Sequence, residues 1–162
     1  MNDADEYARY TAGLNDFRYR ATLFFEHTVT TPDEVIARVE LAPRQIRRIG
    51  EPRTTPRGNA LNGLRSANHV SFELPTIDEA SLDEFAGSIA DRLEKHGEFF
   101  RCFTASGGTI ELFVGIFARR GCDTLFPPVL SRRLGELGVG LRLDYYADTD
   151  SPSSTTDEHQ SK

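Results

Sequence analysis

Alternating apolar and polar side chains predict the strands of a half-buried sheet. From residue 17 to residue 26, apolar positions recur at every second residue and only Phe24 interrupts the polar positions between them. Residues 69–74 and 139–145 alternate in the same way. Residues 109–118 carry apolar side chains on both faces, Ile110, Leu112, Val114 and Ile116 on one and Phe113 and Phe117 on the other. That last pattern indicates an interior strand.

Capping sequences predict where the helices begin. Glu34 stands three residues after Thr31, so the threonine can cap the first turn while the glutamate reaches back to it, and Pro32 suits the first helical position. We expect this short helix to end at Pro43. A second capping box, Ser81 to Glu84, opens an amphipathic helix, and a third helix follows two prolines at 127–128 and stops at Gly138.

A tight hairpin is predicted around the Ser-Gly-Gly turn at residues 106–108, with residues 99–105 and 109–118 as its strands. In that hairpin Cys102 would be a small core side chain opposite about Leu112. The element order β-α-β-α-β-β-α-β then predicts an α+β fold. We expect a mostly antiparallel or mixed five-stranded sheet packed with about three helices, forming one domain over residues 17–147.

Charge separates the two ends from this domain. Residues 1–16 hold four acids and one base, and residues 148–162 also hold four acids and one base, so each end carries a charge of -3 and together they account for the net charge of -6. We expect residues 1–16 to be an acidic, partly disordered N-terminal arm and residues 148–162 a disordered acidic tail. The acidic start is unlike a signal peptide and no segment is apolar enough for a membrane helix, so we expect a cytoplasmic protein without membrane contact.

The types and spacing of the polar residues predict no enzyme, no metal site and no cofactor. The histidines, His27, His69, His96 and His159, have no ligand-like spacing and suit capping or surface roles. The acid pairs at 33–34, 78–79 and 83–84 fall at or near helix starts, where carboxylates stabilise the helix dipole. The glycines at 107–108 lie between two predicted strands, unlike a phosphate-binding loop.

The two cysteines, Cys102 and Cys122, are expected to be reduced and unlinked. Cys122 follows Arg119-Arg120-Gly121, and neighbouring arginines can lower the pKa of an exposed thiol. A packed, inert thiol is the simpler interpretation of each cysteine. An enzyme with a reactive thiol at Cys122 is retained as the third functional alternative.

An arginine-rich segment at residues 44–65 is left without a structural explanation. It contains six arginines and a single acid, Glu51; the arginines are Arg44, Arg47, Arg48, Arg53, Arg57 and Arg65. They can contact a protein partner or an anion such as phosphate or a nucleic-acid backbone. Alternatively, they can form a solvated loop whose arginines pair with acids of the helices or the ends. The overall acidity, and the lack of interleaved aromatic residues, do not favour nucleic acid.

Several segments together resemble a bacterial domain-of-unknown-function family, number four-two-seven-nine in that series, over residues 17–147. The matching positions are the helix start at 31–35, Leu41-Ala42-Pro43, Ile49-Gly50, and the closing stretch from 134 to 146. Within them we assign structural roles to Thr31, Pro32, Glu34, Pro43, Gly50, Leu137, Gly138, Asp144 and Tyr146. One departure is a tryptophan expected in the second strand, which Val70 or Phe72 must replace. The resemblance implies a compact α+β domain without established catalytic residues.

The functional hypothesis is therefore a small binding module that acts by protein–protein interaction. Relatives of similar size resemble immunity or accessory proteins of bacterial toxin and defence loci, which is an analogy of fold and size. The acidic ends could meet a basic partner, because complementary charge speeds encounter. Phosphate or nucleic-acid contact through the arginine segment remains the second hypothesis.

Overall fold

The computed structural model describes residues 17–55, 57–75, 81–119 and 121–147. The predicted arm at 1–16 and tail at 148–162 lie outside these ranges. In chain order the elements are β1 (Phe17–His27), α2 (Pro32–Val39), β2 (Gln45–Arg47), β3 (Pro52–Thr54), β4 (Ala60–Leu64), β5 (Asn68–Leu74), α3 (Leu82–Glu94), α4 (Gly97–Ala105), β6 (Thr109–Ala118), α5 (Pro128–Glu136) and β7 (Val139–Ala147).

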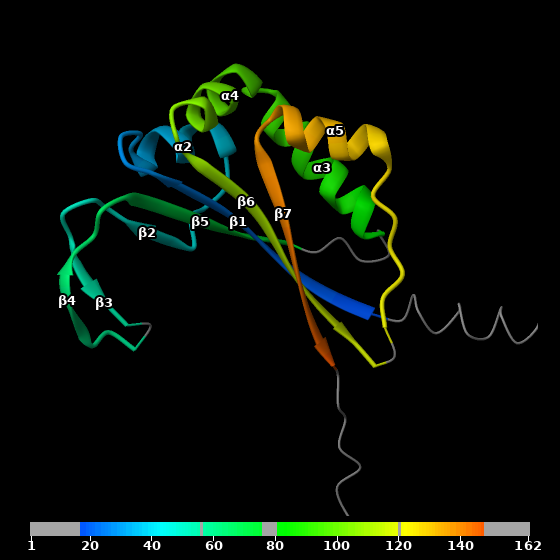
Figure 1. Ribbon diagram of the computed structural model, residues 1–162, viewed down its shortest axis with the longest axis horizontal. Helices are drawn as coiled ribbons and strands as arrows, with labels where there is room; N and C mark the ends of the chain where they lie inside the picture. The colour runs from blue at the N-terminus through cyan, green and yellow to red at the C-terminus, as the bar shows by residue number, and fades with distance from the viewer. Residues whose placement is uncertain (1–16, 56, 76–80, 120, 148–162) are drawn as a thin grey trace, which may run out of the picture.

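Five strands form the main sheet in the order β2-β5-β1-β6-β7, with β1 at its centre (Figure 1). β1 is antiparallel to both β5 and β6, and β2 is antiparallel to β5. β7 runs parallel to β6, since the connection between them contains α5 and crosses back over the sheet. The predicted α+β fold with a mixed five-stranded sheet is confirmed.

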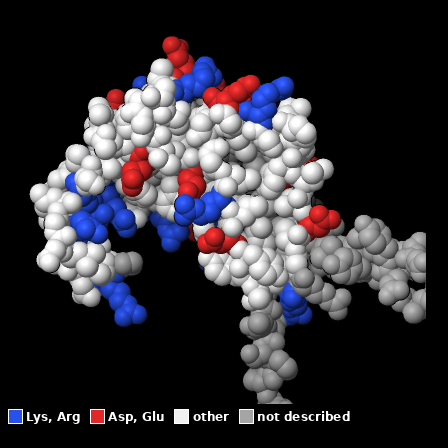
Figure 2. All heavy atoms as spheres, viewed as in Figure 1, with Lys and Arg blue, Asp and Glu red and all other residues white. Residues whose placement is uncertain are grey.

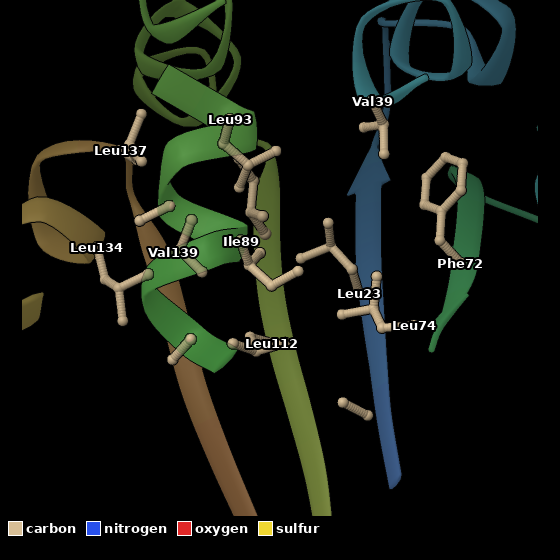
Figure 3. Packing of buried hydrophobic residues seen from close by; sticks show 14 of the residues in the cluster. Leu23, Val39, Phe72, Leu74, Ile89, Leu93, Leu112, Leu134, Leu137 and Val139 are labelled. Carbon is tan, nitrogen blue, oxygen red and sulfur yellow. The ribbon is translucent and has the colours of Figure 1, made fainter. Parts of the chain in front are cut away.

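The helices lie on one side of the sheet, and the core fills the space between them and that side (Figure 1). Alternation along the strands sends every second side chain into this core, so Leu23 of β1 lies between Phe72 of β5 and Leu112 of β6. Figure 3 shows Ile89 and Leu93 of α3 reaching toward these strands. All five side chains are 5% exposed or less, which makes the helix-facing side of the sheet the hydrophobic centre of the domain.

Both predicted capping boxes are present. The Thr31 hydroxyl accepts from the Glu34 amide at 3.4 Å, and the Glu34 carboxylate accepts from the Thr31 amide at 2.8 Å. The Thr31 amide and hydroxyl both donate to the Glu34 carboxylate, each at 2.8 Å, and these two bonds lower the pKa of the Glu34 carboxyl. Ser81 and Glu84 form the same reciprocal pair before α3. α2 ends at Val39 rather than at Pro43, because Glu40 turns left-handed with φ 57°.

The predicted hairpin around residues 106–108 is wrong, because residues 97–105 form helix α4. Phe100 and Phe103 face the core from successive turns, whereas Cys102 is exposed on the opposite side of the helix. Gly107 has a φ of +95° and the Gly108 amide donates to the Phe103 carbonyl at 2.9 Å, so the two glycines close the helix. Cys102 is therefore neither a core residue nor opposite Leu112, which pairs with Leu23 and Leu141.

The arginine-rich segment at residues 44–65, in which no strand was predicted, contains three short strands. β2 joins the edge of the main sheet, and β3 and β4 form a separate two-stranded hairpin. Every residue of β3 and β4 is exposed, so neither strand has the alternation that signals a buried face. The hairpin projects from the β2 edge on the side away from the helices (Figure 1).

Buried polar side chains fix the end of β1. His27, expected in a capping or surface role, is only 4% exposed. Its Nδ1 accepts from the Thr30 amide at 3.0 Å, and its Nε2 lies 3.1 Å from the Ser106 carbonyl oxygen. The Asn68 side chain joins the same corner, donating to the Thr30 carbonyl and accepting from the Ile49 amide. These bonds connect the start of α2, the α4–β6 turn and the base of the hairpin.

Replacing Gly138 with alanine should lower the free energy of unfolding, because this residue has a φ of +71° and a Cβ there would lie 2.6 Å from the Thr104 side chain. The left-handed conformation alone costs about 1–2 kcal/mol for an L residue. Gly135 in α5 has open space around it, so Gly135→Ala should instead stabilise the protein by about 0.5–1 kcal/mol. Urea unfolding measures the free energy of unfolding of both variants, and equal changes in the two would refute the prediction.

Candidate functional site

One face of the sheet has no helix over it in the described part of the chain, and we call it the open face (Figure 1). Strand register places the following side chains on it: Arg18, Arg20, Thr22, Phe24 and Glu26 of β1; Arg47 of β2; His69, Ser71 and Glu73 of β5; Thr109, Glu111, Phe113, Gly115 and Phe117 of β6; and Arg142, Asp144 and Tyr146 of β7.

A shallow hollow of about 460 Å³ lies on the open face where β1 ends and β6 begins, and Phe24 and Phe113 contribute its aromatic lining. The two rings meet edge to face with centroids 6.3 Å apart, and the His69 ring lies 5.7 Å from Phe24. The remaining lining residues are polar or charged: Glu26, Thr109, Glu111 and Arg142. An apolar floor with charged side chains around it is suited to binding another molecule.

The β5 side of the hollow is cationic. Arg47 lies directly opposite His69 in the β2–β5 register, so both side chains project from the same face. Burial lowers the pKa of His69, Arg47 lowers it further, Glu26 opposes them, and Arg65 adds a smaller lowering. His69 therefore favours its neutral form beside two permanently charged guanidinium groups.

On the β7 side the charges are compensated. Arg142 and Glu111 form an ion pair of 2.8 Å across the β6–β7 ladder. Beyond it the Phe117 and Tyr146 rings stack with centroids 5.1 Å apart. Gly115 leaves room for this stack, since a Cβ there would lie 3.3 Å from the Tyr146 ring. Half-exposed aromatic side chains thus extend along the open face beyond the hollow.

The arginine segment, residues 44–65, lies beside the hollow and separates into two sets. Arg48 donates to both carboxylate oxygens of Asp33 in α2, at 3.0 and 3.1 Å, and Arg44 lies 3.8 Å from Glu73. The other four arginines form no ion pair with the described residues: Arg47, Arg53, Arg57 and Arg65. Figure 2 shows basic atoms gathered on the hairpin side, next to the notch beneath the sheet.

The described residues hold no metal-ligand set, because no three His, Cys, Asp or Glu side chains come together. Thr30 and His27 are the nearest approach to a nucleophile and base, with Thr30 Oγ1 2.7 Å from His27 Nδ1. The adjoining cavity is only about 10 Å³, the size of a single water probe, and the bond fastens the loop after β1 to the end of that strand.

The comparisons decide the family. Residues 17–148 match the family described as Domain of unknown function (DUF4279). The chain belongs to this family. Comparison with the curated proteins and with the solved structures gave no match. No helix in the described ranges is long and apolar enough to cross a membrane.

The motif positions of this DUF4279 domain divide into two groups. Most lie where the fold turns: the cap of α2 (Thr31, Pro32 and Glu34), Pro43 before β2, Gly50 at the base of the hairpin with φ +82°, and Leu137 and Gly138 between α5 and β7. Asp144 and Tyr146, which were assigned structural roles from sequence, are exposed on the open face.

The aromatic floor was missed in the sequence, although its signal was present. Phe24 interrupts the polar face of β1, and Phe113 and Phe117 occupy the second face of β6. Those features predicted an interior strand, which is correct for β6. Hydrophobicity alone did not distinguish a second face covered by protein from one left open.

Cys102 should react with a maleimide before Cys122 at neutral pH. Cys102 is exposed, whereas Cys122 is only partly exposed, and burial together with Asp123 raises the pKa of the Cys122 thiol. This direction is opposite to the lowered pKa considered from the sequence. Mass spectrometry of partially labelled protein identifies the modified residue. Faster labelling of Cys122 would restore the thiol-enzyme hypothesis.

His69→Gln should change how stability depends on pH. The pKa of His69 in the folded protein lies below its usual 6.5. The neutral imidazole therefore contributes to the free energy of unfolding above pH 6.5, and this contribution is lost as the pH falls through the folded pKa. Between about pH 7.5 and 5.5, the wild type should therefore lose unfolding free energy relative to the variant. Urea unfolding of both proteins across this pH range measures the difference in unfolding free energy. If the free energies of the two proteins change in parallel with pH, the lowered pKa of His69 is contradicted.

Proposed function

We propose that this DUF4279 domain is a non-enzymatic binding module, whose open face and arginine segment take up an acidic segment of a partner protein. The observation that carries the proposal is the position of arginines without an ion-pair partner among the described residues, beside an aromatic floor on a sheet face that no described helix covers. The proposed role is sequestration of that partner, in the manner of an immunity or accessory protein.

The residue types on this face support a protein interface. Aromatic side chains and arginine are enriched where proteins meet, and they carry much of the binding energy. Phe24 and Phe113 project from paired strands and pack edge to face against each other, so little conformational entropy is lost when they are covered. The hairpin adds exposed apolar side chains, with Leu61 44% and Leu64 63% exposed. The open face and the hairpin together provide aromatic and aliphatic side chains that a partner can cover.

The charge left unpaired supports an acidic partner. Glu111 and Glu73 already lie against Arg142 and Arg44, whereas Arg47 and Arg65 have no carboxylate partner among the described residues. A carboxylate arriving beside His69 would meet both unpaired guanidinium groups. This places the attraction on the arginine side of the hollow and gives the partner a preferred orientation. The acidic ends of the chain lie outside the described residues.

Single-stranded nucleic acid is the second candidate, favoured by one specific observation. Aromatic rings beside arginines form the kind of platform on which bases stack, and the aromatic residues absent from the arginine segment are supplied by β1 and β6. Against this, Glu26, Glu111 and Asp144 share the open face and would repel a backbone that carries a phosphate at every nucleotide, whereas a peptide can place its carboxylates at the arginine side alone. A protein partner therefore suits the mixed charge better.

Peptides selected from a random phage-displayed library on immobilised protein should be rich in Asp and Glu next to aromatic or aliphatic residues. Arg47→Glu/Arg65→Glu should weaken their binding about tenfold or more in fluorescence anisotropy. The matched control is Arg101→Glu/Arg132→Glu, which changes exposed arginines of α4 and α5 and should leave binding unchanged.

The proposal fails if the selected peptides show no acidic enrichment, or if both double variants bind them equally. A labelled oligothymidine measured in parallel tests the second candidate. Tight oligothymidine binding that falls steeply with salt and is lost in Arg47→Glu/Arg65→Glu, without acidic-peptide binding, would replace the first candidate by the second.

A further inference from the structure

β7 is an edge strand with little protection against pairing. It continues in register with β6 over nine residue pairs, and no described element lies beyond it in the sheet. The opposite edge, β2, has only three residues. Natural edge strands are usually blunted by charged side chains, proline, a bulge or shortness, and β7 is long, has no proline and no bulge, and carries only one charge of each sign, Arg142 and Asp144.

Exposed apolar side chains mark the same edge. Leu143 is 43%, Tyr145 51% and Tyr146 45% exposed, in a strand whose start at Val139 is buried. Leu143 and Tyr145 share the helix side of the sheet with Val139, so the helices cover only the first part of this side of β7. Such a strand can lower its exposed apolar area by pairing with another strand.

We propose that two copies of this chain associate by antiparallel pairing of their β7 strands, centred on Leu143. The two five-stranded sheets would then form one continuous sheet of ten strands, with the helices of both copies on the same side. The interface is isologous, because a two-fold axis that passes between the two Leu143 residues, perpendicular to the sheet, relates the copies. This inference is independent of the proposed function.

The sequence of β7 is complementary to itself in this register. Arg142 of each copy lies opposite Asp144 of the other, which gives two cross-strand charge pairs on the open face. On the helix side Leu143 meets Leu143, and Leu141 meets Tyr145. Gly140 lies opposite Tyr146, and an aromatic ring across from a glycine is a favourable cross-strand pair.

Neighbouring registers lack this complementarity. Centring the pair on residue 142 places Arg142 opposite itself, and centring it on residue 144 places Asp144 opposite itself. Like charges directly opposite destabilise a strand pair, so the register centred on Leu143 is selected. The existing ion pair of Arg142 with Glu111 is compatible with it, since a guanidinium has five N–H donors and can serve both carboxylates.

Sedimentation equilibrium of the full chain tests the inference. The wild type should show a reversible equilibrium between one and two chains, and R142D and D144R should each raise the dimer dissociation constant about tenfold or more. An equimolar mixture of R142D and D144R should restore association, because each acidic position then faces an arginine. R132D, in an exposed position on α5, should associate like the wild type.

The result that overturns the inference is a wild type that sediments as a single chain at every concentration. Association that R142D and D144R leave unchanged would also overturn it, as would single-variant defects that mixing does not repair. The last outcome would indicate that the substitutions damage the fold. R47E/R65E should associate like the wild type, so loss of partner binding and loss of self-association remain distinguishable.

Discussion

Burial of apolar side chains between the four described helices and one face of the five-stranded sheet is the interaction on which the rest of this structure depends. The central strand β1 contributes Leu23 and Phe25, and the Phe25 ring lies within 6 Å of Phe72, Phe100 and Phe103. Since the described helices all lie on that side, the other face contributes little to the core (Figure 1). Its aromatic and basic residues are therefore available for contacts outside the domain.

Sequence reasoning succeeded where one local signal had one structural meaning. Thr31 with Glu34, and Ser81 with Glu84, have capping geometry that few other structures use, and the alternation around Leu23 persists long enough to define a strand. It failed at Gly107-Gly108, because paired glycines suit both a hairpin turn and a helix end. The open face depends on which strands become neighbours, and strand order is not encoded in any one segment.

The two proposed surfaces would act together. Pairing through β7 leaves the arginine segment free in each copy, because it lies at the β2 edge of the sheet, whereas Arg142 belongs both to the lining of the hollow and to the strand pair. A dimer would then present two open faces on the same side of one extended sheet, and a partner with two acidic segments could engage both. Such double engagement strengthens binding through effective concentration, without any new contact.

The central claim is that the partner meets the open face rather than the helices. Photo-crosslinking in the native host tests it most directly, with p-benzoylphenylalanine placed at Phe113 on the open face or at Arg101 on α4, whose side chain is exposed. The account predicts one discrete protein adduct from the Phe113 position, lost when Arg47→Glu/Arg65→Glu is added, and none from the Arg101 position. An adduct of equal yield from Arg101, or one that persists in the arginine variant, would contradict it.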